Sequence, residues 1–140
     1  MSWKSQIIQL TELPEAQKQK IDATFFPPLS TAEISGWESE HDVQLPEEWR
    51  SFYRESNGME AKRGEWQPIF PLEDCRILPM GCERPVPWLE FGLAAGFRFY
   101  VGLGQSVTVY RVAEFGSEEE FFGRNLTEHL RNLFRGGQQP

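Results

Sequence analysis

The segment 45–58 constrains the fold of this chain more than any other, because it carries the start, the apolar face and the end of one short helix. Pro46 suits the first helical position, where its missing N–H costs no hydrogen bond. Asn57-Gly58 supplies a left-handed stop at the other end. The apolar side chains recur with the spacing of one helical face, at Leu45, Trp49, Phe52 and Tyr53. The segment therefore predicts a short helix with one buried stripe.

A second helix is predicted to begin at Ser30, which has capping-box spacing to Glu33. One face of this helix carries Ile34, Trp37 and His41. His41 is expected to pack beside Trp37 or to cap the helix end. The link to the segment 45–58 is short, which predicts an angled pair of helices.

Residues 1–29 are expected to form a helical and extended lead that is loosely attached. The lead has only a narrow apolar stripe, interrupted by Pro14, at Trp3, Ile7 and Leu10. The sequence does not decide whether this lead packs on the domain. At the other end of the chain, residues 137–140 are expected to form a disordered tail.

The middle of the chain changes to short runs of strand-forming residues, marked by prolines and glycines. Strands are predicted at 66–72, 76–78, 88–92, 97–101 and 106–112, and the last two form the clearest hairpin. A final helix is predicted after Asn125, with Glu128 at the capping-box position. Helices, then strands, then a helix indicate an α+β fold, with the domain spanning residues 30–136.

The 140-residue chain carries a net charge of -7. This acidic balance argues against nucleic acid as a partner, because such binding needs phosphates to be neutralised, and against an anionic membrane surface. It suits a basic protein partner, although moderate negative charge also keeps ordinary proteins soluble. The N-terminal residues show no apolar signal region, and no run approaches about 18 apolar residues. The chain is therefore expected to be cytoplasmic, with reduced cysteines.

No residue pattern points to catalysis, a metal or a cofactor. Glu38 and His41 have E-x-x-H spacing, but a carboxylate-bridged metal pair needs that motif twice. Cys75 is expected to be a small buried thiol at the start of a strand, and His129 a surface residue of the final helix. Two tryptophans could anchor an interface, although core packing is the first expectation for Trp66 and Trp88.

Several residues of the helical region together form a recognisable pattern. They are Ile34, Glu38, Leu45, Pro46, Trp49, Phe52, Asn57 and Gly58, with Trp37 on the same helix. This pattern resembles the signature of the SUKH superfamily, which includes the Smi/Knr-type regulators of fungal cell-wall synthesis and many bacterial immunity proteins. The resemblance covers about residues 30–135. It departs at 93–96, where many members carry a Gly- and Asp-rich turn and this chain has Leu-Ala-Ala-Gly.

The resemblance implies an α+β fold with a single, mostly antiparallel sheet flanked by helices, and no catalysis. It implies that the signature residues determine the fold and do not bind a partner. It further implies an immunity protein that binds and neutralises a co-encoded toxin, often a nuclease. A regulatory or scaffold domain of the same fold, without a toxin, is the alternative.

Acidic side chains in predicted loops are the candidate contacts to a basic toxin domain, namely Glu60, Glu65, Glu118, Glu119 and Glu120. Neighbouring carboxylates could also serve general acid–base chemistry, but consecutive residues rarely converge on one substrate. The sequence leaves the identity of the partner, the interface and the oligomeric state open.

Overall fold

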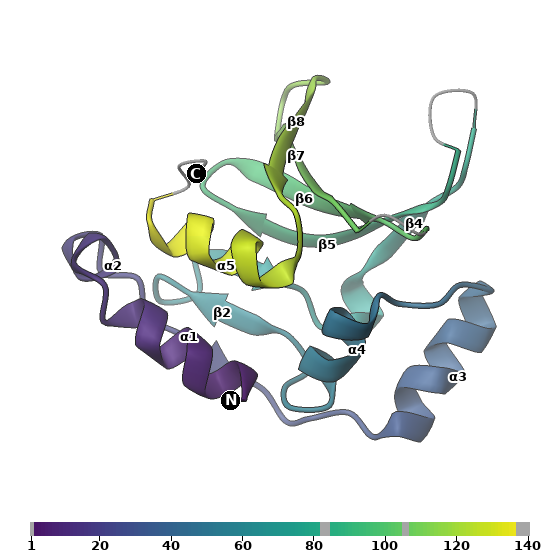
Figure 1. Ribbon diagram of the computed structural model, residues 1–140, viewed down its shortest axis with the longest axis horizontal. Coiled ribbons are helices and arrows are strands. Elements are labelled where there is room, and N and C mark those ends of the chain that lie inside the picture. Colours follow the sequence, from purple (N-terminus) through teal and green to yellow (C-terminus); the bar gives the residue numbers. More distant parts are fainter. Residues whose placement is uncertain (1, 82–84, 105–106, 137–140) are drawn as a thin grey trace.

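The computed structural model describes residues 2–81, 85–104 and 107–136 and contains one antiparallel sheet accompanied by helices (Figure 1). The helices are α1 (Trp3–Thr11), α2 (Pro14–Lys18), α3 (Thr31–His41), α4 (Glu47–Tyr53), the 3-10 helix η1 (Leu72–Asp74) and α5 (Leu126–Phe134). The strands are β1 (Thr24–Phe25), β2 (Met59–Ala61), β3 (Trp66–Ile69), β4 (Arg76–Leu78), β5 (Trp88–Ala94), β6 (Phe97–Gly102), β7 (Val109–Ala113) and β8 (Glu119–Gly123). The predicted α+β class is confirmed.

The sheet runs in the order β1-β2-β3-β5-β6-β7-β8, and β4 pairs with the first half of β5. All of these pairings are antiparallel. The predicted hairpin forms from β6 and β7, although β7 begins at Val109, later than expected. Strand β8 pairs with β7 and ends the path, so it is an edge strand.

The two faces of the sheet have different surroundings. Side chains alternate between faces along a strand, and on β6 the buried Phe99 and Val101 face the hydrophobic core. Tyr100 and its cross-strand neighbour Tyr110 point to the other face and are outside that core cluster. Figure 1 shows the helices below β6, β7 and β8 in that view, which is the core side of these strands.

Helix α1 packs into the core, so the expectation of a loosely attached lead is wrong. Trp3 is 8% exposed and Ile7 is fully buried. The backbone N–H of Trp3 donates to a Glu55 carboxylate oxygen at 3.0 Å, and its indole N–H donates to the Ser51 hydroxyl at 2.9 Å. These contacts lie about 50 residues away along the chain, which is why local periodicity understated them. The tail expected at 137–140 lies outside the described residues.

Helix α3 begins with the predicted capping box, in which Ser30 and Glu33 each accept the other's backbone N–H. His41 stacks on Trp37, with ring centroids 4.3 Å apart, and its Nδ1 lies 2.8 Å from the Trp37 carbonyl oxygen. The predicted packing of His41 is therefore confirmed.

Helix α4 is shorter than the segment that predicted it. Pro46 is the N-cap residue and not the first helical residue, and the helix ends at Tyr53, before Asn57-Gly58. Gly58 does have a left-handed φ of +93°, but it serves the turn into β2. The Asn57 side chain anchors that turn, because its oxygen accepts the Leu72 N–H at 2.8 Å.

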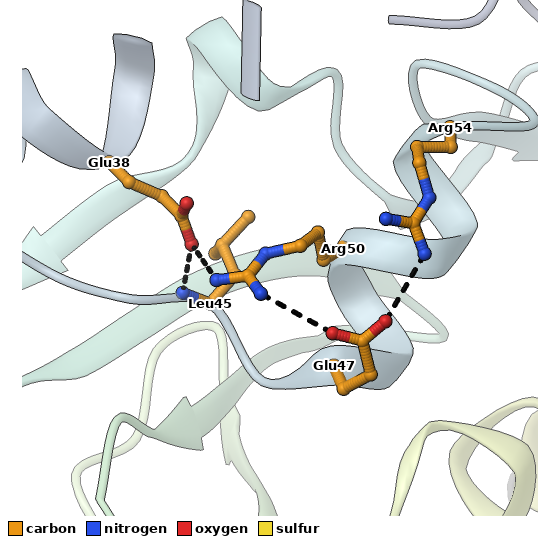
Figure 2. A network of polar contacts seen from close by, with 5 residues as sticks. All are labelled: Glu38, Leu45, Glu47, Arg50 and Arg54. Carbon is orange, nitrogen blue, oxygen red and sulfur yellow. Dashed lines mark hydrogen bonds and ion pairs between the residues drawn. The ribbon is translucent and has the colours of Figure 1, made fainter. Parts of the chain in front are cut away.

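A buried carboxylate joins α3 to α4, as Figure 2 shows. Glu38 is 9% exposed, and one of its oxygens accepts the Leu45 N–H at 2.7 Å and an Arg50 N–H at 2.8 Å. Arg50 also contacts Glu47, which in turn pairs with Arg54. Because the Leu45 N–H precedes the helix and is buried, Glu38 supplies a bond that this N–H would otherwise lack.

Candidate partner-binding surface

The predicted contact residues fall into two groups at opposite parts of the sheet. Glu60 lies in β2 and Glu65 in the turn that follows it. Glu118 directly precedes β8, and Glu119 and Glu120 begin that strand. Four strands, β3, β5, β6 and β7, separate β2 from β8 in the sheet order. The five glutamates therefore cannot form one patch.

Three of these glutamates lie in strands, so their assignment to loops is wrong. Glu60 pairs with Thr24 of β1 and is half-buried. Glu119 and Glu120 pair with β7 residues Val112 and Arg111. Glutamate has a weak intrinsic preference for strands. Pairing with a neighbouring strand outweighs that preference where the charged side chain can point to solvent.

The connection from β7 to β8 is exposed and carries additional features that the sequence analysis passed over. Residues 113–121 are all exposed. Phe115 is 99% exposed at the turn, next to Glu114. Backbone hydrogen bonds fix the turn, from the Glu114 N–H to the Gly96 carbonyl at 2.9 Å and from the Gly116 N–H to the Ala113 carbonyl at 2.8 Å. We refer to residues 114–121 as the acidic hairpin.

The acidic hairpin has more negative charge than its neighbourhood compensates. Glu120 pairs with Arg111, whose Nε lies 3.0 Å from the carboxylate. The Arg111 guanidinium also lies over the Phe97 ring, 4.1 Å from its centroid. Within the described residues, no ion pair involves Glu114, Glu118 or Glu119. Three carboxylates therefore face solvent beside an exposed phenylalanine.

His129 is not a surface residue, which corrects the expectation from sequence. It is fully buried, with ring centroids of Phe91, Phe99 and Phe122 within 5.6 Å. Its Nε2 lies 3.2 Å from the Pro68 carbonyl oxygen, and its Nδ1 has no partner in the described structure. Burial lowers the pKa of His129 to about 3, so the ring is neutral at physiological pH and serves the core.

Cys75 is buried beside Tyr53, as expected of a structural thiol. The Tyr53 hydroxyl lies 3.3 Å from the Cys75 sulfur and donates to the Phe70 carbonyl oxygen at 2.7 Å. Burial raises the pKa of the Cys75 thiol to about 12. The thiolate needed for nucleophilic attack is therefore not formed near neutral pH.

Cavities of the described residues lie away from the acidic hairpin. One of about 370 Å³ lies between α1 and α5 and is lined by apolar side chains such as Ile7 and Leu130. A second, of about 570 Å³, lies at the end of α3, between Asp42 and Met80, and a third, of about 320 Å³, is lined by residues such as Leu45. None of the three brings together a nucleophile and a base in the arrangement that covalent catalysis requires.

Known proteins and known kinds of site give no further assignment. No protein-family model and no curated protein matches this chain. The described ranges 2–81, 85–104 and 107–136 hold no group of three or more histidine, cysteine, aspartate or glutamate side chains that could bind a metal ion. None of the helices described is both long enough and apolar enough to span a bilayer. The acidic hairpin is thus the surface feature that most needs a functional explanation.

Proposed function

We propose that this protein is a non-catalytic, SUKH-like immunity protein that binds and neutralises a co-encoded nuclease toxin through its acidic hairpin. The observation that carries this proposal is the exposed hairpin in which three carboxylates without an ion-pair partner among the described residues lie within four residues of the exposed Phe115. A monomer that exposes an aromatic ring so fully, among like charges, is suited to a partner that covers the ring and neutralises the charge.

A nuclease fits this surface by charge. The substrate-binding cleft of such an enzyme is basic, because it must neutralise phosphates. In the proposed complex, the carboxylates of Glu118 and Glu119 take the positions of substrate phosphates, and Phe115 provides an apolar anchor beside them. Attraction between the acidic hairpin and a basic cleft also accelerates the encounter of the two proteins.

The signature residues contribute to the fold and are not exposed for contact with a partner. Trp49 and Phe52 are fully buried, and Glu38 is engaged with the backbone of Leu45 and with Arg50. These side chains are unavailable to a partner. Their roles agree with the expectation that the pattern shared with the SUKH superfamily stabilises the fold.

A binding measurement with the toxin domain encoded by the adjacent gene tests the proposal. The double variant Glu118→Lys/Glu119→Lys should weaken binding at least about tenfold at low salt, with a smaller effect at about 0.5 M salt. Glu65→Lys is the matched control, because it reverses an exposed charge at the other part of the sheet and should leave affinity nearly unchanged.

The biological readout is survival of cells that express the toxin. The wild-type protein should protect them, and the double variant should not. Absence of binding by the wild-type protein together with absence of protection would overturn the proposal. Binding to a cellular protein, with no toxin gene nearby, would instead support a regulatory or scaffold role.

A further inference from the structure

A row of aromatic side chains crosses the sheet on the face away from the core. Tyr100 pairs with Tyr110 across β6 and β7, and Tyr110 pairs with Phe121 across β7 and β8. Directly opposed residues of antiparallel strands point to the same face. The Trp88 ring lies parallel to the Tyr110 ring, with centroids 4.9 Å apart and an interplanar angle of 2°. We refer to Trp88, Tyr100, Tyr110 and Phe121 as the aromatic row.

A buried carboxylate holds one end of this row. Glu90 is 5% exposed and accepts a hydrogen bond from the Tyr100 hydroxyl at 3.0 Å. Its other oxygen lies 3.6 Å from an Arg98 nitrogen, so the buried charge has a cationic partner. Desolvation and the Glu90 charge raise the pKa of Tyr100 to about 12, and the hydroxyl therefore stays protonated as a donor. The rings are held before any partner arrives, which reduces the entropy lost on binding.

Trp88 is 9% exposed and supports the row from within, whereas the other three members are accessible, and the row continues into the acidic hairpin. Phe121 is 42% exposed, and Tyr100 and Tyr110 are half-buried. Val112 is two residues after Tyr110 on β7, so its side chain points to the same face of the sheet as Tyr110. Val112 pairs with Arg98 on one side and with Glu119 on the other, so Glu119 borders this face. Phe121 belongs to both surfaces, and Glu119 of the acidic hairpin borders the row. An apolar centre bordered by charges is the usual arrangement of a protein interface.

We propose that the aromatic row is the apolar centre of the toxin interface and receives arginine and lysine side chains of a basic protein surface. This inference rests on the proposed immunity function and assigns the part of the structure that recognises the toxin. Cations bind over the faces of tyrosine rings, and arginine and aromatic residues dominate binding energy at interfaces. The stems of the basic side chains lie along the aromatic row, and their charged groups reach Glu119.

A second copy of this chain fits the surface less well. The chain carries a net charge of -7, and a symmetric dimer through this face would bring two copies of the same acidic surface together. Like charges placed opposite one another across an interface disfavour association. Charge complementarity therefore favours a basic partner.

The inference is tested by calorimetric binding to the purified toxin domain from the adjacent gene. Phe121→Ser and Val112→Lys should each weaken binding by on the order of tenfold or more. Phe121→Ser removes an apolar contact, and Val112→Lys places a positive charge beside the row. Ile8→Ser is the matched control, because Ile8 is an apolar side chain of similar exposure, 50%, on α1. Circular dichroism and thermal unfolding establish that each variant is folded.

The possible outcomes separate the two proposals. Loss of affinity in both sheet variants, with normal affinity in the control, supports the aromatic row as the centre of the interface. Wild-type affinity in both folded sheet variants, with loss in Glu118→Lys/Glu119→Lys, overturns the inference and leaves the immunity function in place. Absence of binding by the wild-type protein overturns both. If one sheet variant fails to fold, the other decides.

Discussion

Replacing His129 with glutamine should change how the stability of this protein depends on pH. The Pro68 carbonyl can only accept a hydrogen bond, so the neutral imidazole carries its proton on Nε2, and Nδ1 lies without a partner among phenylalanine rings. A proton added at Nδ1 would create a buried cation with no compensating acceptor. Glutamine has an amide nitrogen near the position of Nε2 and does not titrate.

The sign and size of the effect follow from the two pKa values of His129. In the unfolded chain the pKa is near the ordinary value of 6.5, and in the folded protein burial lowers it to about 3. Above about pH 7.5 neither state is protonated, and the histidine has no effect on the pH dependence. As the pH falls below 6.5, the unfolded chain binds a proton that the folded protein does not. Stability is therefore lost as the pH falls, at about 1.4 kcal/mol per pH unit, or about 2 kcal/mol at about pH 5.

Urea unfolding followed by tryptophan fluorescence measures this loss in the wild-type protein and in His129→Gln. Glutamine itself is expected to destabilise the core at both pH values. The difference between the two proteins should shrink by about 2 kcal/mol from about pH 7.5 to about pH 5, because only the wild-type protein contains the buried titrating group. Ionisation of the carboxylates affects both proteins and cancels in this comparison. A difference that stays constant between the two pH values would refute the reasoning.

Three further variants test the fold. Glu38→Ala should cost about 2–3 kcal/mol of folding free energy, because it leaves a buried backbone N–H without an acceptor, whereas the exposed Glu47→Ala should cost less than about 1 kcal/mol in the same urea experiment. Gly58→Ala should cost more than Gly96→Ala: both glycines have positive φ, but an added Cβ at Gly58 would lie 2.6 Å from a backbone nitrogen, whereas that at Gly96 would meet open space. In a Cys82→Ser variant, whose remaining cysteine is Cys75, labelling of Cys75 by a thiol reagent near neutral pH should be only as fast as the protein unfolds. Equally fast labelling with and without urea would contradict the burial of Cys75.

Features set by contacts within one helical turn could be read from the sequence. Ser30 caps α3, and the Asn125 side chain accepts the Glu128 N–H at 2.8 Å at the start of α5. A full capping box at α5 would also need the Glu128 carboxylate to accept the N–H of Asn125. It accepts the N–H of Arg124 instead. Such caps are local because their donors and acceptors are three or four residues apart.

His129 is assigned to the surface by its residue type, although the helical spacing of α5 indicates a buried position. The apolar stripe of α5 contains Leu126, Leu130 and Leu133, and all three are buried. Position 129 is three residues after the first and four before the last, so helical spacing places it on the same face. The spacing contained the necessary information, but a histidine preceded by Thr127 and Glu128 favoured a surface assignment. Two of the phenylalanine rings that surround it, those of Phe91 and Phe99, come from strands distant in sequence.

Strand β8 shows a feature that no local pattern could predict. The run of glutamates before Phe121 lacks alternating apolar residues, and pairing with β7 determines its structure. The same is true of the aromatic row, whose members come from four strands. Cross-strand register is a tertiary property, and a shift by one residue would move each side chain to the other face.

The glutamates of β8 protect an open sheet edge, and in the proposed complex they also contact the partner. An edge strand exposes backbone groups that can pair with any other strand, and charged side chains suppress such association. At the far end of β8, the buried Asn132 side chain donates to the Phe122 carbonyl oxygen at 2.8 Å and occupies that backbone acceptor. Nearer the turn, the carboxylates repel a second acidic copy and attract a basic surface. In the proposed complex, the same charges would therefore oppose self-association and favour a basic partner, whereas the buried contacts of Glu38 stabilise the fold. Substitutions in the acidic hairpin should consequently alter binding and self-association while leaving the helical region folded.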